Sequence, residues 1–121
     1  EDPIVSEIIE ATRAELGITP REISDAEIID RLTLALANEG ARIFEEGIAQ
    51  RASDIDVVYC HGYGFPRFRG GPMHAAEARG LQSVVDRIQQ FQQTLNPQNW
   101  VLAPLLNQLA SDGGSFRDIN T

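Results

Sequence analysis

Residues that restrict the backbone are densest in one stretch of the chain, and the fold is organised around it. The stretch is His61-Gly62-Tyr63-Gly64-Phe65-Pro66-Arg67-Phe68-Arg69-Gly70-Gly71-Pro72. Its twelve residues include four glycines, two prolines, three aromatics and two arginines. Gly reaches backbone angles that other residues avoid, whereas Pro fixes φ and lacks an N–H donor. The stretch therefore predicts an ordered loop of defined shape. Helical patterns lie on both sides of this elbow loop, residues 61–72, so it joins two helical halves.

Three helices are predicted before the elbow loop. The first follows the Asp2-Pro3 start signal and ends at Gly17. The second begins at the capping box Ser24-Asp25-Ala26-Glu27 and runs to about Gln50, with one apolar face made of Ile28, Leu32, Leu36, Ile43 and Phe44. The third begins at Ser53-Asp54 and directs three residues toward the core, namely Ile55, Val58 and Tyr59.

Two features of the second helix bear on packing. Glu27 and Arg31 are four residues apart, as are Arg42 and Glu46, so both pairs are expected to form ion pairs on the helix surface. Gly40 and Gly47 weaken a helix by about 1 kcal/mol each relative to Ala, so their expected benefit is close packing against another helix.

Three helical segments are predicted after the elbow loop. Pro72 begins a helix that ends at Gly80, and the apolar stripe of residues 81–95 is the most regular in the chain. Pro104 begins a last helix closed by Gly113-Gly114, and the tail from Arg117 is expected to be loose. No strand is predicted. The fold class is therefore all-α, with about six helices in one domain over residues 1–121.

Composition narrows the function. A chain of 121 residues suits one domain, and a net charge of -8 argues against binding a nucleic-acid backbone. The single Cys60 excludes an internal disulfide and favours a reducing compartment, and no apolar run is long enough to span a membrane. The chain starts at Glu1 and its one methionine is Met73, so we expect it to be excised from a longer polypeptide.

The residue types and their spacing give little support for a catalytic or metal site. His61 and His74 flank the elbow loop, but their spacing does not suit a metal pair, and His61 is expected to hydrogen-bond to the loop backbone. Cys60 and His61 are adjacent, so on a helix they point about 100° apart and do not form a nucleophile–base pair. The carboxylate pairs Glu45-Glu46 and Asp54/Asp56 are interpreted as solvated surface or helix N-terminal charges.

Two polar groups leave a binding or packing role open. Arg67 and Arg69 lie among glycines, so they bind an anion such as a phosphate or form structural and interface ion pairs. Asn38-Glu39 interrupts a small-residue helix face, and a partly buried Glu39 is expected to find an arginine partner. We prefer packing or interface roles for both groups.

Several segments together resemble the C-terminal helical domain of the 3-hydroxyacyl-CoA dehydrogenases. They are Ile28-Ile29-Asp30-Arg31, Leu36-Ala37-Asn38-Glu39-Gly40-Ala41-Arg42, Glu45-Glu46-Gly47-Ile48-Ala49, Asp54-Ile55-Asp56-Val57 and His61 through Met73. The chain looks most like the second C-terminal repeat of the multifunctional fatty-acid β-oxidation enzymes. The resemblance covers roughly residues 18–95, and the region from Trp100 to Phe116 is similar to the tail of that family.

The resemblance implies a parent enzyme that uses NAD and holds it on a Rossmann domain beside a His/Glu pair. This chain has no Gly-x-Gly-x-x-Gly motif after a strand, so it is predicted to contain no catalytic residue, no cofactor-binding residue and no metal ligand. The first repeat of the family has a substrate-side Asn where this chain has Asp30. That departure argues against direct catalytic help, and the chain alone is expected to be inactive.

Two hypotheses follow. In the first, the chain is a noncatalytic domain that packs against a sister helical domain, or a second copy in homodimer fashion, and braces the substrate cleft of its parent. The expected structural or interface residues are Arg31, Asn38, Glu39, Gly40, Gly47, His61, Tyr63, Gly64, Pro66, Arg67 and Arg69. In the second, it is a stand-alone module that grips an anion such as acyl-CoA through Arg67 and Arg69. The expected location is the cytoplasm, or the peroxisome if the source is eukaryotic.

Overall fold

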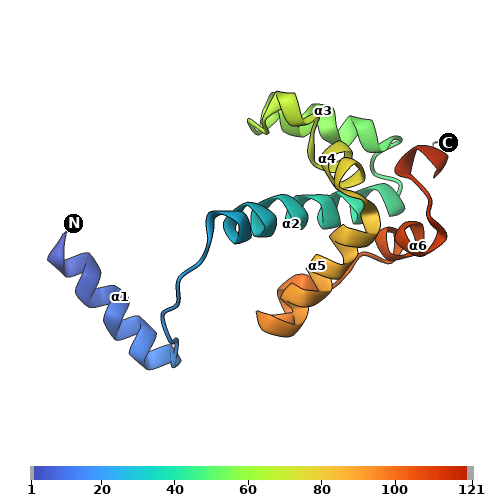
Figure 1. Cartoon of the computed structure of the whole chain (residues 1–121). Helices are drawn as coiled ribbons and strands as arrows, with labels where there is room; N and C mark the ends of the chain where they lie inside the picture. Colours follow the sequence, from blue (N-terminus) through green and yellow to red (C-terminus); the bar gives the residue numbers. More distant parts are fainter. Residues whose placement is uncertain (1, 120–121) are drawn as a thin grey trace.

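The long helix α2 (Asp25–Glu45) is the axis around which the other elements pack (Figure 1). In the computed structural model, which describes residues 2–119, α4 and α6 lie directly against α2, and α3 packs mainly on α4. Helix α5 completes the body by packing on α6 and α4. The described residues form six α-helices and no strand, which confirms the all-α prediction.

The described chain contains six α-helices and three 3-10 turns. Their bounds are α1 (Pro3–Leu16), α2 (Asp25–Glu45), α3 (Ala52–Gly62), the 3-10 turn η1 (Arg67–Arg69), α4 (Pro72–Arg79), α5 (Leu81–Thr94), η2 (Pro97–Trp100), α6 (Pro104–Asp112) and η3 (Phe116–Ile119). The elbow loop is ordered as predicted and contains η1. No helix among residues 2–119 combines the length and hydropathy that a membrane span requires.

The core-facing side of α2 differs from the predicted apolar face. Leu34, Ala37, Ala41 and Phe44 are buried, whereas Ile28 and Leu32 remain 45% and 64% exposed. The sequence pattern suggested one continuous stripe because large apolar residues recur at helical spacing along the whole helix. Phe44 is buried and Leu36 and Ile43 are half-buried, so this part of the predicted face is confirmed. Leu34 and the small residues Ala37 and Ala41 complete the buried side, while the large residues near the start of α2 remain exposed.

The two glycines of the second predicted helix have different roles. Gly40 is buried, and a Cβ there would lie 2.4 Å from Met73 Sδ of α4, which confirms the close-packing prediction. The packing role predicted for Gly47 is wrong. Gly47 lies beyond the end of α2 with φ +71°, and no atom lies within 4 Å of a Cβ built at this position. A left-handed residue ends a helix, so α2 stops at Glu45 and not near Gln50.

The N-terminal caps of α2 and α3 agree only in part with those predicted from the sequence. Ser24 Oγ accepts from the Glu27 amide at 3.2 Å, as expected, but the Glu27 carboxylate pairs with Arg21 and with Arg31. Helix α3 begins at Ala52, and its cap comes from Asp54, which accepts from the Arg51 amide at 3.1 Å.

The prediction that three residues of α3 point toward the core is only partly correct. Ile55 is buried and Tyr59 is half-buried, as the pattern indicated, but Val58 is 54% exposed. The reason is that α3 contacts the body on one side only, mainly through α4.

The C-terminal elements close the core. The apolar stripe of α5 is buried within the domain itself, together with Trp100, Leu106 and Leu109. The prediction of a loose tail from Arg117 is wrong as far as Ile119, which belongs to η3 and packs against the core. Residues 120–121 of that tail lie outside the described residues.

Helix α1 stands apart from this body (Figure 1). Its capping is as predicted, since Asp2 Oδ1 accepts from the Ile4 amide at 3.0 Å and Gly17 ends it in a left-handed conformation. None of its residues is buried, and residues 17–24 lead from it to α2 without a helix. The apolar residues of α1 therefore have no cover within the described chain.

Candidate functional site

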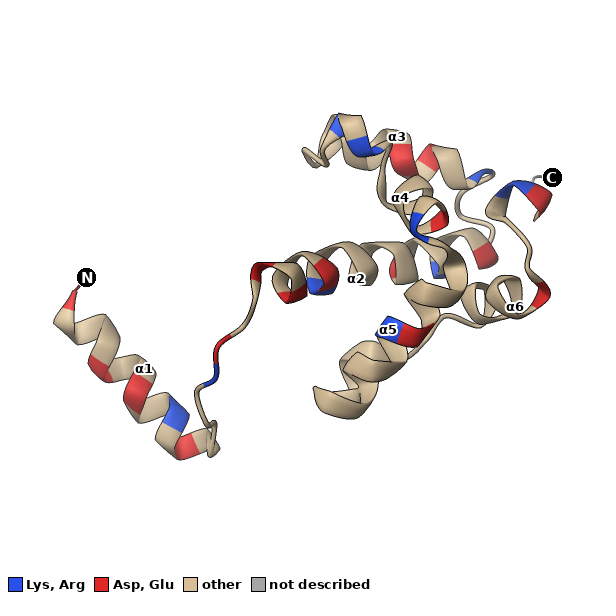
Figure 2. Cartoon of the chain, viewed as in Figure 1, with Lys and Arg blue, Asp and Glu red and all other residues tan. Residues whose placement is uncertain are grey.

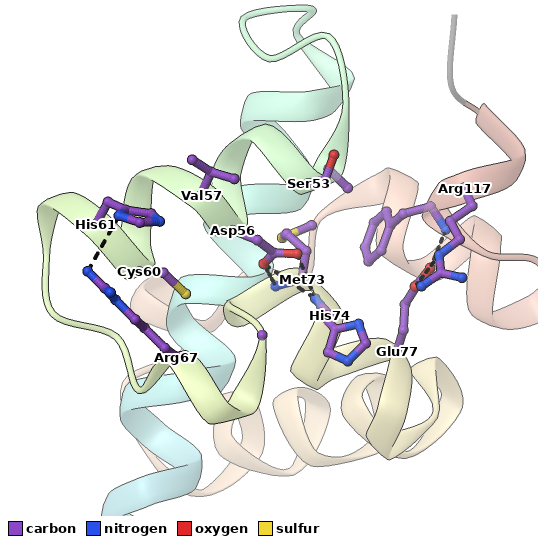
Figure 3. A pocket seen from close by; sticks show the side chains of 13 residues that line it. Ser53, Asp56, Val57, Cys60, His61, Arg67, Met73, His74, Glu77 and Arg117 are labelled. Atoms are coloured by element: carbon purple, nitrogen blue, oxygen red, sulfur yellow. Dashed lines mark hydrogen bonds and ion pairs between the residues drawn. The ribbon is translucent and has the colours of Figure 1, made fainter.

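A hollow of about 570 Å³ lies between α3, the elbow loop, α4 and the C-terminal segment (Figure 3). We call it the α3–α4 hollow. Its lining contains both histidines and the one cysteine of the chain, and the lining side chains are Ser53, Asp56, Val57, Cys60, His61, Arg67, Met73, His74, Glu77, Phe116 and Arg117.

Helix α3 supplies one wall because of its periodicity. Ser53, Asp56, Val57 and Cys60 follow the spacing i, i+3, i+4, i+7, which places them on one helix face. The same face turns toward α4, against which α3 packs. Polar residues that look scattered in the sequence are therefore neighbours around one hollow.

Asp56 is the central group of this wall. Its carboxylate accepts from the Met73 amide at 2.7 Å and from the His74 amide at 3.1 Å, so it caps the N-terminus of α4. Burial raises the pKa of the Asp56 carboxyl above its ordinary value, although the two backbone hydrogen bonds act in the opposite direction. The sequence interpretation of Asp56 as a solvated or local helix charge is wrong. A usable signal existed, since α4 begins with Gly71-Pro72 and has no capping side chain of its own.

Glu77 forms the opposite end of the hollow. It accepts from Ser115 Oγ at 2.5 Å and from the Phe116 amide at 2.7 Å, and it lies 3.9 Å from Arg117 Nε. These bonds hold the C-terminal segment against α4. Sequence reasoning missed this role because the partners are 38 and 39 residues apart.

His61 and Arg67 meet at the third edge of the hollow. Arg67 Nη2 lies 3.5 Å from His61 Nδ1, and both side chains are exposed (Figure 3). Within the described residues, His61 does not form the predicted hydrogen bond to the loop backbone. The His61 side chain contacts the Arg67 guanidinium instead. Neither His61 nor Arg67 forms an ion pair with a carboxylate within residues 2–119.

Arg69 lies on a different surface. Its guanidinium sits 5.5 Å from the Phe68 ring centroid, and it lines a groove of about 400 Å³ between α2 and α4. The elbow loop therefore directs its two arginines to different hollows.

The arrangement suits binding better than catalysis. Asp56 and Glu77 are both occupied with backbone donors, and within residues 2–119 no group of three or more His, Cys, Asp or Glu side chains could hold a metal ion. A covalent mechanism needs a nucleophile, a base and an orienting group in mutual contact. The hollow offers instead an exposed guanidinium, two imidazoles and an apolar floor.

Comparison with known proteins identifies the family. The family model for the 3-hydroxyacyl-CoA dehydrogenase C-terminal domain matches residues 28–117. The chain belongs to this family. It is 45% identical over 113 residues to the peroxisomal bifunctional enzyme of Danio rerio and 44% identical over 114 residues to that of Homo sapiens. It is 33% identical over 94 residues to the glyoxysomal fatty acid beta-oxidation multifunctional protein MFP-a of Brassica napus.

This dehydrogenase C-terminal domain is a small part of those relatives. The first two matches cover 93% of the chain but 16% of the relative, and the third covers 74% of the chain and 13% of the relative. The chain thus spans about a sixth of the length of the curated relatives that it matches most fully.

The remaining predicted residues of the domain lie outside the α3–α4 hollow. Arg31 pairs with Glu27 at 2.7 Å, as predicted, whereas Arg42 pairs with Glu39 at 3.1 Å and not with Glu46. Glu39 does have an arginine partner, but it is exposed, and the buried polar residue is its neighbour Asn38. Tyr63, Gly64 and Pro66 are exposed parts of the elbow loop, with Gly64 at φ +73°.

Asp30 organises a second cluster in the dehydrogenase domain. It accepts from Arg79 Nη1 at 2.5 Å and from Arg87 Nε at 2.8 Å, so it joins α2 to α4 and α5. The hydrogen bond from Arg79, followed by that from Arg87, holds the pKa of the Asp30 carboxyl below its ordinary value, while burial opposes this. An ion-pair role thus occupies the position at which the resemblance implies a substrate-side Asn in the first repeat of the family.

Replacing Asp30 by Asn is expected to change how stability depends on pH. A carboxyl whose pKa is lowered by folding stabilises the protein at pH values above its ordinary pKa of about 3.9, and this contribution is lost as the pH falls from there through the lower pKa of the folded state. Asp30→Asn should therefore lower the free energy of unfolding at pH 7 by about 1 kcal/mol, and the deficit should shrink toward pH 3. Urea unfolding at a series of pH values measures this difference.

Asp112→Asn is the matched control for the Asp30 prediction, because Asp112 is exposed and forms no ion pair within residues 2–119. It should lower the free energy of unfolding at pH 7 by much less than Asp30→Asn does. An Asp30→Asn deficit of the same size at pH 3 and pH 7 would contradict the ion-pair argument.

Proposed function

We propose that this chain is a noncatalytic second C-terminal repeat of an NAD-dependent 3-hydroxyacyl-CoA dehydrogenase of fatty-acid β-oxidation. It packs against a sister helical domain and braces the substrate cleft of the larger enzyme. The family match and the names of the relatives support the enzyme class. NAD, the acyl-CoA substrate and a Rossmann domain belong in this proposal to the parent enzyme.

The observation that carries the proposal is an uncovered apolar surface at the N-terminal half of α2. We call it the α2 patch, and it consists of Ile28 (45% exposed), Ile29 (49%) and Leu32 (64%). This half of α2 extends out of the helical body toward α1 (Figure 1). Adjacent apolar side chains that lack cover are typical of an interaction surface.

Helix α1 extends the same argument. Its exposed apolar residues are Ile4, Val5, Ile8, Ile9 and Leu16, and none of them packs on the body. An isolated amphipathic helix of this length is marginal in water, so a packing partner is needed to stabilise it. Acidic residues occur along α1 and along the N-terminal half of α2 (Figure 2), and Glu10, Glu27 and Asp30 among them pair with arginines of the chain itself.

The apolar stripe of residues 81–95 takes no part in the proposed packing surface, because it faces the domain's own core. The α2 patch and α1 remain as the surfaces through which the sister domain is contacted.

A size measurement tests the proposal on the chain itself. With the sister domain absent, the α2 patch should drive self-association, so the wild-type chain is expected to dimerise with increasing concentration in analytical ultracentrifugation. Ile28→Glu/Leu32→Glu should be monomeric, because a charge desolvated in an apolar interface is costly. Its melting temperature should stay close to wild type, because both side chains are exposed.

Val58→Glu is the matched control for the α2 patch. Val58 is a similarly exposed apolar residue, at 54%, but it lies on α3. It should leave self-association unchanged. A wild-type chain that stays monomeric at all concentrations, or an equal loss in Val58→Glu, would overturn the proposed packing surface.

The second hypothesis, a stand-alone module that grips acyl-CoA with both arginines, meets a geometric obstacle. Arg67 and Arg69 line separate hollows, so one anion does not reach both guanidinium groups in this arrangement. Of this hypothesis we keep only the possibility that Arg67 binds an anion. For location, we propose the peroxisome if the source is eukaryotic, as the names of the relatives suggest, and otherwise the cytoplasm.

A further inference from the structure

Arg67 is unusual among the arginines of this acidic chain. The chain has 18 acidic residues and 10 arginines, and eight of those arginines form ion pairs in the part of the chain that the structure describes. Within that part, Arg67 and Arg69 are the exceptions. Arg69 stacks near the Phe68 ring and faces the α2–α4 groove, whereas Arg67 faces the α3–α4 hollow.

Arg67 and His61 together offer donors at one edge of the hollow. A guanidinium only donates, so its 3.5 Å contact with His61 Nδ1 uses the imidazole nitrogen as the acceptor. The proton of the neutral ring then resides on Nε2, which is a second donor. His74, from the first turn of α4, adds another imidazole to the same lining (Figure 3).

His74 interacts with the charge of Asp56, but the two carboxylates that line the hollow form no ion pair with Arg67 or His61. Asp56 is held by the Met73 and His74 amides, and its charge is offset by the positive end of α4. Glu77 is held by Ser115 Oγ and the Phe116 amide and lies next to Arg117. Neither forms an ion pair with Arg67. The positive charge of Arg67 is therefore available to a ligand.

The remaining lining adds an apolar floor. Val57, which is 58% exposed, offers apolar surface to the same hollow, and Met73 and Phe116 line it from the core at 1% exposure each. Apolar surface beside a few converging polar groups is the usual form of a small-molecule site.

We propose that the α3–α4 hollow binds a small phosphorylated organic molecule. The phosphate contacts the Arg67 guanidinium and the His61 imidazole, and the organic part rests mainly on Val57. A phosphate is favoured over a carboxylate because it has three acceptor oxygens to engage a planar guanidinium fork together with a separate imidazole donor. This site is independent of the packing role proposed for α1 and α2, since it lies on other elements.

Titration of the ¹⁵N-labelled chain followed by NMR tests the site directly. Phenyl phosphate should give saturable shifts of amides around the hollow, those of Gly70, Met73 and His74 among them. Arg67→Gln should weaken binding about tenfold, the size expected for losing one charge-assisted contact. Arg69→Gln removes the same charge two residues away on another surface, and it should change the affinity by less than about twofold.

Three probes separate the possible ligands. Phenyl phosphate should bind more tightly than inorganic phosphate, because the ring adds apolar contact, and more tightly than benzoate, which carries the same ring on a carboxylate. Equal affinity for inorganic phosphate would overturn the organic part of the proposal, and equal affinity for benzoate would overturn the phosphate part.

Two further outcomes bear on the site as a whole. An absence of saturable shifts at the hollow, or an equal loss in Arg67→Gln and Arg69→Gln, would overturn the site and leave only general attraction of anions to arginine. Arg67 is exposed, so Arg67→Gln is expected to have the same melting temperature as the wild type. His61→Gln is a second change at an exposed residue, and it should also weaken binding.

Discussion

Gly71→Ala is expected to destabilise the domain by about 3–5 kcal/mol, a large part of the stability of a typical small protein. Gly71 has φ +105°, and a Cβ at this position would lie 2.3 Å from Asp56 Oδ1 and 2.4 Å from Asp56 Cβ. Asp56 has no room to retreat, because the same carboxylate caps α4 through the Met73 and His74 amides. The variant must either distort the elbow loop or release the cap of α4.

Thermal and urea unfolding measure the Gly71 effect. We expect a fall in melting temperature of about 10 °C or more. Gly113→Ala is the control, because Gly113 also has a positive φ, +66°, but no atom lies within 4 Å of its built Cβ. It reports the backbone cost alone, about 1–2 kcal/mol. If both variants lose the same stability, the contact between Asp56 and Gly71 does not constrain the fold.

Asn38→Ala is the second large effect, with an expected loss of about 2–4 kcal/mol. Asn38 is 5% exposed, donates to the Val101 carbonyl at 2.8 Å and accepts from the Ala103 amide at 2.8 Å. Arg42 also donates to the Val101 carbonyl, so that acceptor keeps a partner in the variant. The Ala103 amide belongs to a fully buried residue and loses its acceptor, so most of the cost falls there.

Urea unfolding of Asn38→Ala, compared with Asn107→Ala, checks this assignment. Asn107 is an exposed residue of α6, and its replacement should change the free energy of unfolding by no more than about 0.5 kcal/mol. A small loss in Asn38→Ala would show that water replaces the amide and that the connection between α2 and the start of α6 contributes little.

Local signals were sufficient for the helices themselves. Asp2-Pro3, Ser24, Pro72, Pro104 and the glycines at 17, 80 and 113 mark helix ends that the structure reproduces, because capping and backbone restriction act within a few residues. They were insufficient where an end depends on distant residues. Asp56 caps α4 from 17 residues away, and no pattern within α4 names it.

Burial was the less predictable quantity. The helical period of α2 identified its apolar residues but not which of them face the core, because that depends on where α4 and α6 lie. Glu39 and Asn38 illustrate this point: they are adjacent, yet Asn38 is buried and Glu39 pairs with Arg42 on the surface. The candidate site shows it again, since His61 and Arg67 were singled out in the sequence but Glu77 and Phe116 were not.

The sequence by itself determined the helical class, the helix starts, the ordered elbow loop and the family resemblance. These depend on residue types at short spacing, and short-range steric and hydrogen-bonding preferences decide them. Tertiary structure alone decided that Asp56 caps α4, that Asp30 joins Arg79 and Arg87, that the α2 patch is exposed and that Arg67 faces a different hollow from Arg69. Those outcomes depend on contacts between residues far apart in the chain, and only the packing of whole helices brings such residues together.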